Sequence, residues 1–184
     1  MSDHICRIAI IGTESTGKST LAAALAEHFE APWAPEYVRA FWDRREGKID
    51  AVDLPTIARG QIANEEAAIA KADRVVFFDA TLLMNVRWAD DLHGGQIPSW
   101  IRQAADERAN AAALHLYCAA DLPWEADPQR AFADPVVWQA SAERCRRMLT
   151  ERGLAYEPIV GAGEQRLARA IAAVEAVLEA KVRR

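Results

Sequence analysis

Residues 12–19 read Gly-Thr-Glu-Ser-Thr-Gly-Lys-Ser and satisfy every fixed position of the pattern G-x-x-x-x-G-K-[ST]. An apolar run rich in β-branched residues, 5–11, precedes the pattern and is typical of a buried strand. A strong helix former with an apolar residue at every fourth position, 21–29, follows it. A glycine-containing loop between a strand and a helix is the setting of a P-loop, so this region predicts a phosphate-binding site.

The fixed residues of this loop have separate chemical roles. Backbone N–H groups of such a loop point inward at a β-phosphate, and the helix N-terminus adds partial positive charge. Gly12 and Gly17 permit close approaches and backbone angles that a Cβ would block. Lys18 can bridge the β- and γ-phosphates, and the Ser19 hydroxyl can bind Mg²⁺. The alternative is a glycine-containing turn that matches by chance. The predicted ATP-binding residues are Gly12, Thr13, Glu14, Ser15, Thr16, Gly17, Lys18, Ser19 and Thr20.

The composition of the 184-residue chain is that of an ordinary globular protein, with 51% hydrophobic and 27% charged residues. Its net charge of −5 argues against a general nucleic-acid-binding surface. No apolar stretch approaches the roughly 20 residues that cross a bilayer, and the first residues lack the features of a signal peptide. The three cysteines have no metal-binding or redox spacing. We therefore expect one cytoplasmic domain, residues 1–184, with neither nucleic acid nor a membrane as partner.

Hydrophobic patterning along the chain alternates between strands and helices. The runs 75–78 and 114–118 are almost continuously apolar, as expected for parallel strands covered by helices on both faces. The sequence therefore predicts a three-layer α/β fold with a mostly parallel five-stranded sheet. Segments 90–98 and 121–134 fit neither element, and we interpret them as functional loops. The expected strands are 5–11, a short one near Trp33, 74–78, 114–118 and 155–160, and the expected helices are 18–29, 37–45, 54–71, 82–89, 99–109, 135–152 and 164–182.

Asp79 directly follows the apolar run 75–78, at the carboxyl end of a predicted central strand. A carboxylate at this place can hold Mg²⁺, usually through water, opposite the hydroxyl of Ser19. The alternative is that Asp79 caps the next helix, a position that Asp favours. Because the chain also has a P-loop, we favour the metal-binding role.

Glu36 and Arg39 follow the short strand near Trp33. In sheets of this type ligands bind beyond the carboxyl ends of the strands. A carboxylate and a guanidinium close together could hold a hydroxylated substrate and neutralise a phosphate. An ion pair between residues three apart on a solvated helix face is an equally good interpretation.

Segment 121–134, rich in Pro and Asp, comes directly after the predicted fourth strand. At this position a short lid could close over the phosphates, with Arg130 supplying positive charge to the transferring group. An exposed Pro-rich loop with an incidental arginine is the alternative.

The chain has six tryptophans, which are many for its length. Trp33, Trp88 and Trp100 lie near predicted strand ends or the loops that follow them. Such side chains can stack on a flat aromatic ligand, although most tryptophans are expected to pack in the core or at interfaces.

Together these blocks resemble a known family, the ribosylnicotinamide (nicotinamide riboside) kinase domain of the bacterial bifunctional NAD-biosynthesis regulator and its stand-alone P-loop relatives. The resemblance covers nearly the whole chain. The P-loop alone occurs in many families, whereas these blocks in this order are fairly specific for this family. The blocks are 12–20, 35–39, 58–61, the acidic pair Glu65-Glu66, 77–79, 123–130 and 161–163.

The resemblance implies a compact nucleoside-kinase-like P-loop fold that uses ATP and Mg²⁺ to phosphorylate a ribosyl 5′-hydroxyl. It implies that Glu36, Tyr37 and Arg39 line the acceptor site. It also implies that Asp79 acts at the metal or as the base near the attacking hydroxyl. The lid residues that it implies are Asp127 and Arg130.

Three positions depart from the family pattern. Pro35 stands where the family has a tryptophan directly before the Glu-Tyr pair, and Trp33 is displaced by two positions. Thr81 replaces an acidic residue, and Pro128 replaces a lid glycine. The first departure concerns the aromatic stacking that would recognise nicotinamide.

The resulting hypothesis is an ATP-dependent and Mg²⁺-dependent small-molecule kinase with nicotinamide riboside as acceptor. Another nucleoside or a sugar-like alcohol is the alternative acceptor. A nucleotide-dependent switch or ATPase that acts through a protein partner is an alternative of a different class. A kinase would turn over only with its acceptor, whereas a switch would hydrolyse nucleotide slowly whatever alcohol is added. The expected catalytic residues are Lys18, Glu36, Asp79 and Arg130.

Overall fold

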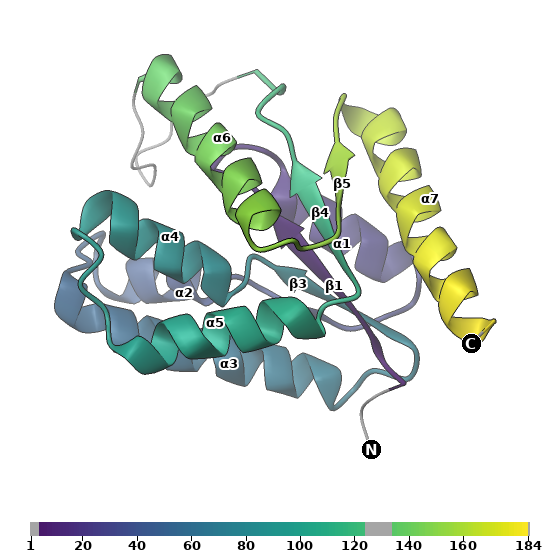
Figure 1. The fold of residues 1–184 in the computed structure, drawn as a ribbon, viewed down its shortest axis with the longest axis horizontal. Helices are drawn as coiled ribbons and strands as arrows, with labels where there is room; N and C mark the ends of the chain where they lie inside the picture. The colour runs from purple at the N-terminus through teal and green to yellow at the C-terminus, as the bar shows by residue number, and fades with distance from the viewer. Residues whose placement is uncertain (1–3, 124–133, 184) are drawn as a thin grey trace.

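The computed structural model describes residues 4–123 and 134–183, in which strands and helices alternate as the sequence predicts (Figure 1). Five strands form one sheet in the order β2-β3-β1-β4-β5. The strands are β1 (Cys6–Ile11), β2 (Trp33–Ala34), β3 (Val75–Asp79), β4 (Leu114–Cys118) and β5 (Tyr156–Ile159). The helices are α1 (Lys18–His28), α2 (Tyr37–Arg44), α3 (Leu54–Ile69), α4 (Leu82–Leu92), α5 (Ser99–Ala111), α6 (Pro135–Glu151) and α7 (Gly163–Val182), with a 3₁₀ helix, η1 (Ala51–Asp53), before α3.

All four strand pairs of the sheet are parallel, so the strands end at the same edge (Figure 1). Every residue of β3 and β4 is buried, which explains their almost continuously apolar sequences. The central strand, β1, pairs with both of them and leads into the P-loop. The predicted parallel five-stranded α/β sheet is therefore confirmed, and the P-loop starts from its centre.

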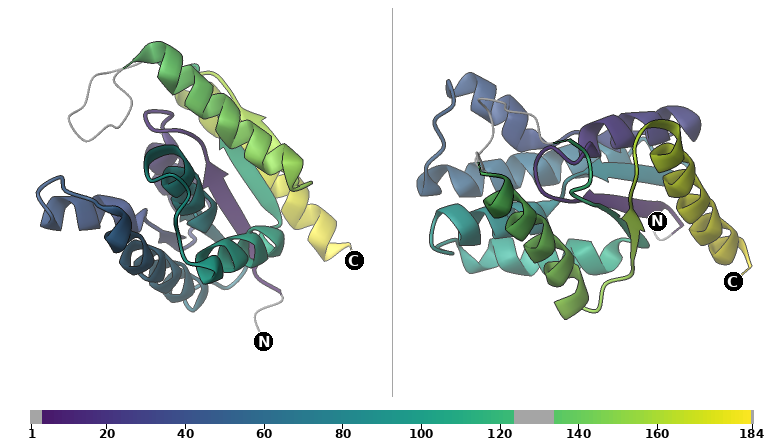
Figure 2. Two further views of the ribbon diagram at one scale, coloured as in Figure 1. Left: turned by 60° about the vertical axis from the view of Figure 1, so that its left-hand side comes forward. Right: turned by 90° about the horizontal axis from the view of Figure 1, so that it is seen from above.

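Helices cover both faces of the sheet, as a three-layer fold requires. Ile8 and Ile10 of β1 belong to a buried cluster formed with α1 and α7. Ala9 and Ile11, which point the opposite way, belong to a second cluster with residues from α3, α4, α5 and α6. Figure 2 shows α1 and α6 on opposite sides of the sheet. The alternation along β1 thus divides the core into two parts.

Helix α4 is longer than the sequence predicts. It continues to Leu92, into the segment 90–98 that the hydrophobic pattern left unassigned. Its polar last turn is stabilised by an ion pair between residues one helical turn apart, in which Arg87 binds Asp91 at 2.9 Å. The next two glycines, 94 and 95, have positive φ angles and end the helix.

The predicted loop 121–134 is described only at its two ends, because residues 124–133 lie outside the described part of the chain. At its C-terminal end Asp134 caps α6, since its carboxylate accepts hydrogen bonds from the backbone N–H groups of Val136 and Val137. The expected lid residues Asp127 and Arg130 lie among the undescribed residues, so their roles stay predictions.

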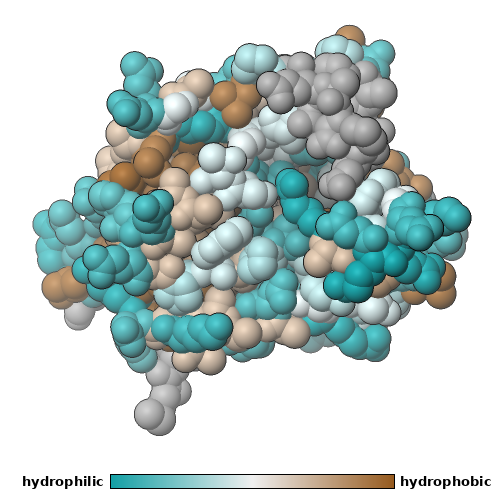
Figure 3. Space-filling view, turned by 180° about the vertical axis from the view of Figure 1, so that it is seen from behind, coloured by the Kyte–Doolittle hydropathy of each residue, from teal (hydrophilic) through white to brown (hydrophobic). Residues whose placement is uncertain are grey.

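Hydrophilic and hydrophobic residues are mixed on the face of the molecule opposite to that of Figure 1 (Figure 3). The described residues there place hydrophobic side chains in separate groups between hydrophilic ones. Within residues 4–123 and 134–183, no helix is both long enough and apolar enough to cross a membrane.

Candidate active site

The loop between β1 and α1 has a tight conformation that depends on two glycines. Gly17, directly before α1, has a φ angle of 72°. A Cβ on Gly12 would lie 2.8 Å from the carbonyl oxygen of Cys118, so a side chain there would push the loop away from β4. Ser15 also has a positive φ angle, 61°, which is uncommon for a residue other than glycine. The loop therefore ends at the N-terminus of α1, where backbone N–H groups and the helix dipole favour an anion.

Contacts within the loop hold Lys18 at its centre. The Nζ atom of Lys18 donates a hydrogen bond to the carbonyl oxygen of Thr13 at 2.7 Å, and the Oγ1 atom of Thr16 donates to the same oxygen at 2.8 Å. The Lys18 side chain is only 6% exposed. The ammonium group is thus held inside the P-loop.

Side chains of α4 and α6 hold the P-loop through hydrogen bonds. The indole N–H of Trp138 donates to the carbonyl oxygen of Glu14 at 2.7 Å. The Ser141 hydroxyl lies 2.6 Å from the Thr13 hydroxyl and accepts a hydrogen bond from Arg87 of α4, also at 2.6 Å. These residues lie far from the P-loop in the sequence, and the sequence analysis did not assign them to the site.

Arg166, near the start of α7, joins three segments at the other side of the loop. Its guanidinium donates to the carbonyl oxygens of Thr16 and Gly161, both at 2.8 Å. It also forms an ion pair with Asp121 at 3.0 Å, and Asp121 in turn accepts a hydrogen bond from the Gly161 N–H. The P-loop, the start of segment 121–134 and the loop before α7 are therefore tied to one buried side chain.

Asp79 ends β3 beside the P-loop, and the Asp79 side chain is 1% exposed. Helix α4 has Thr81 as its N-cap, so the structure does not support the alternative that Asp79 caps it. Burial is the main cause that raises the pKa of the Asp79 carboxyl, and the negative charge of Glu36 raises it further. The Ser19 hydroxyl and the charge of Lys18 act in the opposite direction on this pKa.

The donors at this point fit a magnesium ion. Among the described residues, the Oγ atom of Ser19 and the Oδ1 atom of Asp79 are both buried with no partner besides the interaction between these two side chains. Hard oxygen atoms of this kind are the ligands that Mg²⁺ prefers. Within the described ranges there is no cluster of three or more His, Cys, Asp or Glu side chains that would hold a metal ion. The residues present therefore suit an ion that is shared with phosphate oxygens.

Glu36 and Arg39 form the pair that their spacing predicts. The Nε atom of Arg39 donates to the Glu36 carboxylate at 3.1 Å. Glu36 directly precedes α2, and its side chain is 12% exposed, whereas that of Arg39 is 57% exposed. Both residues line the same cavity as the P-loop, so the pair faces this cavity as well as being an i,i+3 contact on α2.

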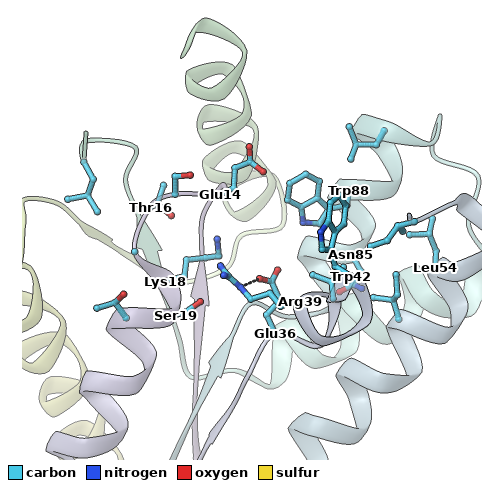
Figure 4. A pocket seen from close by; sticks show the side chains of 18 of the residues that line it. Glu14, Thr16, Lys18, Ser19, Glu36, Arg39, Trp42, Leu54, Asn85 and Trp88 are labelled. Atoms are coloured by element: carbon cyan, nitrogen blue, oxygen red, sulfur yellow. Dashed lines mark hydrogen bonds and ion pairs between the residues drawn. The ribbon is translucent and has the colours of Figure 1, made fainter. Parts of the chain in front are cut away.

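A cavity of about 600 Å³ extends from the P-loop to the space between α2, α3 and α4. Figure 4 shows its two ends, with Thr16, Lys18 and Ser19 on one side and Trp42, Asn85 and Trp88 on the other. The Glu36–Arg39 pair lies between the two ends (Figure 4). Aliphatic side chains complete the wall of the second end, namely Val38, Ile49, Leu54, Ile57 and Leu92. The cavity thus has a cationic end, a charged middle and an aromatic end.

The sequence model of a protein family described as an AAA domain matches residues 7–166. The chain belongs to this AAA domain family. Over 153 residues it is 28% identical to the "Trifunctional NAD biosynthesis/regulator protein NadR" of Salmonella typhimurium, an alignment that covers 81% of this chain and 37% of the relative. This AAA domain chain therefore spans little more than a third of the length of the curated relative that it matches.

Solved structures with the same fold as this AAA domain include NadR protein in complex with NR, with a TM-score of 0.75 and 19% identity over 96% of this chain and 52% of that one. Deoxyadenosine kinase from M. mycoides with bound dATP has a TM-score of 0.59 and 12% identity over 92% of this chain and 99% of that one. These findings confirm the P-loop, nucleoside-kinase-like fold. Together with the family match, they confirm the resemblance to a NAD-biosynthesis regulator.

The structure of this AAA domain brings together most of the residues that the sequence analysis predicts for the site. Residues 14–20 of the P-loop line the cavity, as do Glu36 and Arg39, while Asp79 lies buried beside Ser19. Tyr37 does not line it, because its side chain turns toward α3, where a Cβ on Gly60 would lie 2.3 Å from the tyrosine ring. The expectation that Tyr37 lines the acceptor site is therefore not supported by its position.

The aromatic end of the cavity differs from the sequence expectation. Of the three tryptophans placed near strand ends, Trp88 lines the cavity, whereas Trp33 and Trp100 do not. Trp42 of α2 is the second indole of the wall. The sequence analysis considered only tryptophans near strand ends. Trp42 could have been found by its helical spacing, because it lies three residues after Arg39 and therefore on the same face of α2.

Proposed function

We propose that the chain is an ATP-dependent kinase that phosphorylates the ribosyl 5′-hydroxyl of nicotinamide riboside to give nicotinamide mononucleotide, in a single domain that spans residues 1–184. The observation that carries this proposal is the continuous cavity, in which the Glu36–Arg39 pair separates the P-loop from an aromatic wall. A kinase needs this order of groups, because the acceptor hydroxyl must lie between the transferred phosphate and the rest of the acceptor.

The P-loop end would hold the phosphates of ATP. Lys18 and the N–H groups of residues 12–20 bind the β- and γ-phosphates, and little covalent chemistry is required of the protein. Ser19 and Asp79 would hold Mg²⁺, whose chemistry is to neutralise charge on the transferring phosphoryl group. The buried oxygen atoms of these two residues, which have no partner besides each other's side chain, support this assignment.

The middle of the cavity would bind the acceptor hydroxyl. Glu36 lines the cavity directly, so its carboxylate accepts the hydrogen bond of the 5′-hydroxyl and takes its proton as transfer proceeds. Arg39, held at 3.1 Å from Glu36, faces the same space and compensates negative charge on the phosphate. A weak base suffices here, because the transition state of phosphoryl transfer is largely dissociative.

The aromatic end would bind the ring of the acceptor. Trp42 and Trp88 provide flat faces for stacking, and indole faces also attract a positively charged ring such as the pyridinium of nicotinamide riboside. The Asn85 side chain offers both a donor and an acceptor for the carboxamide. The cavity volume of about 600 Å³ lies within the range of small-molecule sites. The likeness to NadR protein solved with NR also supports this acceptor.

The test is ADP release from ATP and Mg²⁺ across a panel of nucleosides and sugars that includes nicotinamide riboside. Wild-type protein should turn over only with an acceptor, and nicotinamide riboside should stimulate it most. Lys18→Ala should abolish the stimulated rate, whereas Lys71→Ala, at an exposed lysine after α3, should leave it unchanged. Stimulation by a different acceptor would keep the kinase and change its substrate. A slow rate that no acceptor changes would instead indicate the switch or ATPase.

A further inference from the structure

Gln61 of α3 joins the two backbone segments that follow Glu36 and Asp79. Its Oε1 atom accepts a hydrogen bond from the N–H of Tyr37, the residue after Glu36, at 2.9 Å. Its Nε2 atom donates to the carbonyl oxygen of Ala80, the residue after Asp79, at 3.4 Å. The Gln61 side chain is 1% exposed. One buried amide therefore spans the carboxyl ends of β2 and β3.

The surroundings of Gln61 allow only one orientation of its amide. The Nε2 atom also donates to the carboxylate of Glu65 at 3.2 Å. Glu65 is itself 1% exposed and is held by an ion pair with Arg108 of α5. Because Glu65 and the Ala80 carbonyl are acceptors and the Tyr37 N–H is a donor, a reversed amide would lose all of these hydrogen bonds.

The neighbouring Gly60 reinforces the same contact between α2 and α3. A Cβ at this position would lie 2.3 Å from the ring of Tyr37, so glycine is what lets this ring pack on α3. The ring of Tyr37 is thus fixed by Gly60 and its backbone N–H by Gln61. Both contacts set the place where α2 begins, and Glu36 directly precedes that place.

The bridge joins the two segments that carry these carboxylates. Strands β2 and β3 are paired neighbours in the sheet, and the residues after Glu36 and Asp79 are both hydrogen-bonded to the Gln61 amide. A buried hydrogen-bonded bridge of this kind opposes movement of one segment relative to the other.

We propose that Gln61 is a positioning residue for phosphoryl transfer, whose amide fixes the separation of Glu36 from Asp79 and Ser19. This inference rests on the kinase function proposed above. It assigns to Gln61 no contact with a substrate and no part in nucleotide binding. Loss of the bridge should therefore reduce transfer to the acceptor hydroxyl while the P-loop continues to bind ATP.

The test compares Gln61→Met, which has a similar shape and no amide, with Tyr117→Phe as a matched control. Tyr117 is also buried and donates one hydrogen bond, to the Ala142 carbonyl at 3.0 Å, away from both carboxylates. Gln61→Met should lower kcat for acceptor phosphorylation about tenfold or more, because small misplacements of reacting groups are costly. Its Kd for a non-hydrolysable ATP analogue should stay within about twofold of wild type. Tyr117→Phe should change neither quantity.

A conservative variant separates positioning from general loss of stability. In Gln61→Glu a protonated carboxyl group again offers one donor and one acceptor, so kcat should rise toward that of wild type as the pH is lowered. Loss of ATP affinity, acceptor phosphorylation and folded fraction in equal proportion in Gln61→Met would overturn the positioning role. So would a kcat equal to that of wild type.

Hydrogen exchange tests the bridge itself without reference to turnover. The Tyr37 amide should exchange faster in Gln61→Met, while amides in the middle of α1 keep their protection. Unchanged protection at Tyr37 would show that Gln61 does not hold this segment. Wild-type protein that phosphorylates no acceptor would remove the proposed kinase function, and the positioning role with it, whatever the exchange data show about the bridge.

Discussion

The polar side chains around the P-loop differ in how many hydrogen-bond partners the protein itself gives them. The Lys18 ammonium already has a partner, the Thr13 carbonyl, and so it is held in place. Within the described residues, the Ser19 hydroxyl and the Oδ1 atom of Asp79 are buried with no partner besides the interaction between their two side chains. Buried oxygen atoms with spare lone pairs are unfavourable when no further donor or cation meets them. A bound cation would meet these lone pairs, which connects the arrangement to function.

Replacing Asp79 with asparagine separates the role of its carboxylate in catalysis from its effect on the stability of the fold. We expect kcat/KM for phosphorylation to fall about 100-fold or more, because the proposed Mg²⁺ site would lose a charged ligand. We also expect the variant to be at least as stable as wild type at pH 7.5. The reason is that burial raises the pKa of Asp79, so the ionised carboxylate opposes folding at that pH. Steady-state kinetics and urea unfolding measure the two quantities. Full activity, or a clear loss of stability, would contradict the assignment.

The tryptophans allow a matched comparison at the aromatic end of the cavity. Trp88→Leu should raise KM for the acceptor about tenfold, since stacking on an aromatic ring contributes about 1–3 kcal/mol. Trp100→Leu is the control, because Trp100 is also partly buried on a helix but contacts Arg59 outside the cavity. Equal effects of the two substitutions on KM would show that Trp88 does not touch the acceptor.

At the level of helices and loops, the P-loop depends on elements distant from it in sequence. Helix α6 holds it through Trp138 and Ser141, and α7 holds it through Arg166. Arg166 also binds Asp121, the residue at which segment 121–134 begins. Changes at α7 should therefore reach the nucleotide site even though α7 does not line the cavity.

Arg166→Met should weaken ATP binding and lower the free energy of unfolding by about 1.5–3 kcal/mol, the usual contribution of a hydrogen bond to a charged group. The control is Arg169→Met, one turn further along α7, where the pair with Glu157 is exposed to solvent and its loss should cost about 1 kcal/mol or less. Calorimetric titration with an ATP analogue and urea unfolding give the two readouts. Similar losses of ATP affinity in both variants would argue against the special role of Arg166.

For the molecule as a whole, the sequence predicts the order of strands and helices more completely than it predicts which residues line the cavity. Continuous apolar runs and the P-loop pattern predict β1, β3 and β4, because short-range periodicity reflects burial between helices. Helix α4 is underestimated, since Asp91 looks like a loop residue until its ion pair with Arg87 is known. The roles of Gln61 and Arg166 depend on contacts between distant segments, which periodicity does not reveal. The same holds for Trp42, which lines the cavity from a helix.

The stability of the whole fold should depend on pH through His115 of β4. Burial lowers the pKa of this imidazole below its ordinary value of 6.5, with the hydrogen bond to the Ala155 carbonyl acting in the opposite direction. From about pH 6.5 down to the lowered pKa of the folded state, the unfolded chain therefore binds more protons at this group than the folded chain does. The free energy of unfolding should fall as the pH is lowered over this range, by up to about 1.4 kcal/mol per pH unit for one group.

His115→Asn should reduce this slope, because asparagine can donate to Ala155 but does not titrate. Urea unfolding of wild type and variant at pH 7.5, 6.5 and 5.5 would measure it. Slopes that are the same for the two proteins would show that His115 does not contribute to the pH dependence.

The most direct test of the proposed reaction is to identify the product. Wild-type protein would be incubated with ATP, Mg²⁺ and nicotinamide riboside, and the mixture followed by ³¹P NMR and mass spectrometry. The account predicts a new phosphomonoester signal with the mass of nicotinamide mononucleotide, formed in equal amount to ADP and absent with Lys18→Ala. Inorganic phosphate as the only new phosphorus product would contradict it, because the γ-phosphate would then pass to water and not to an acceptor in the cavity.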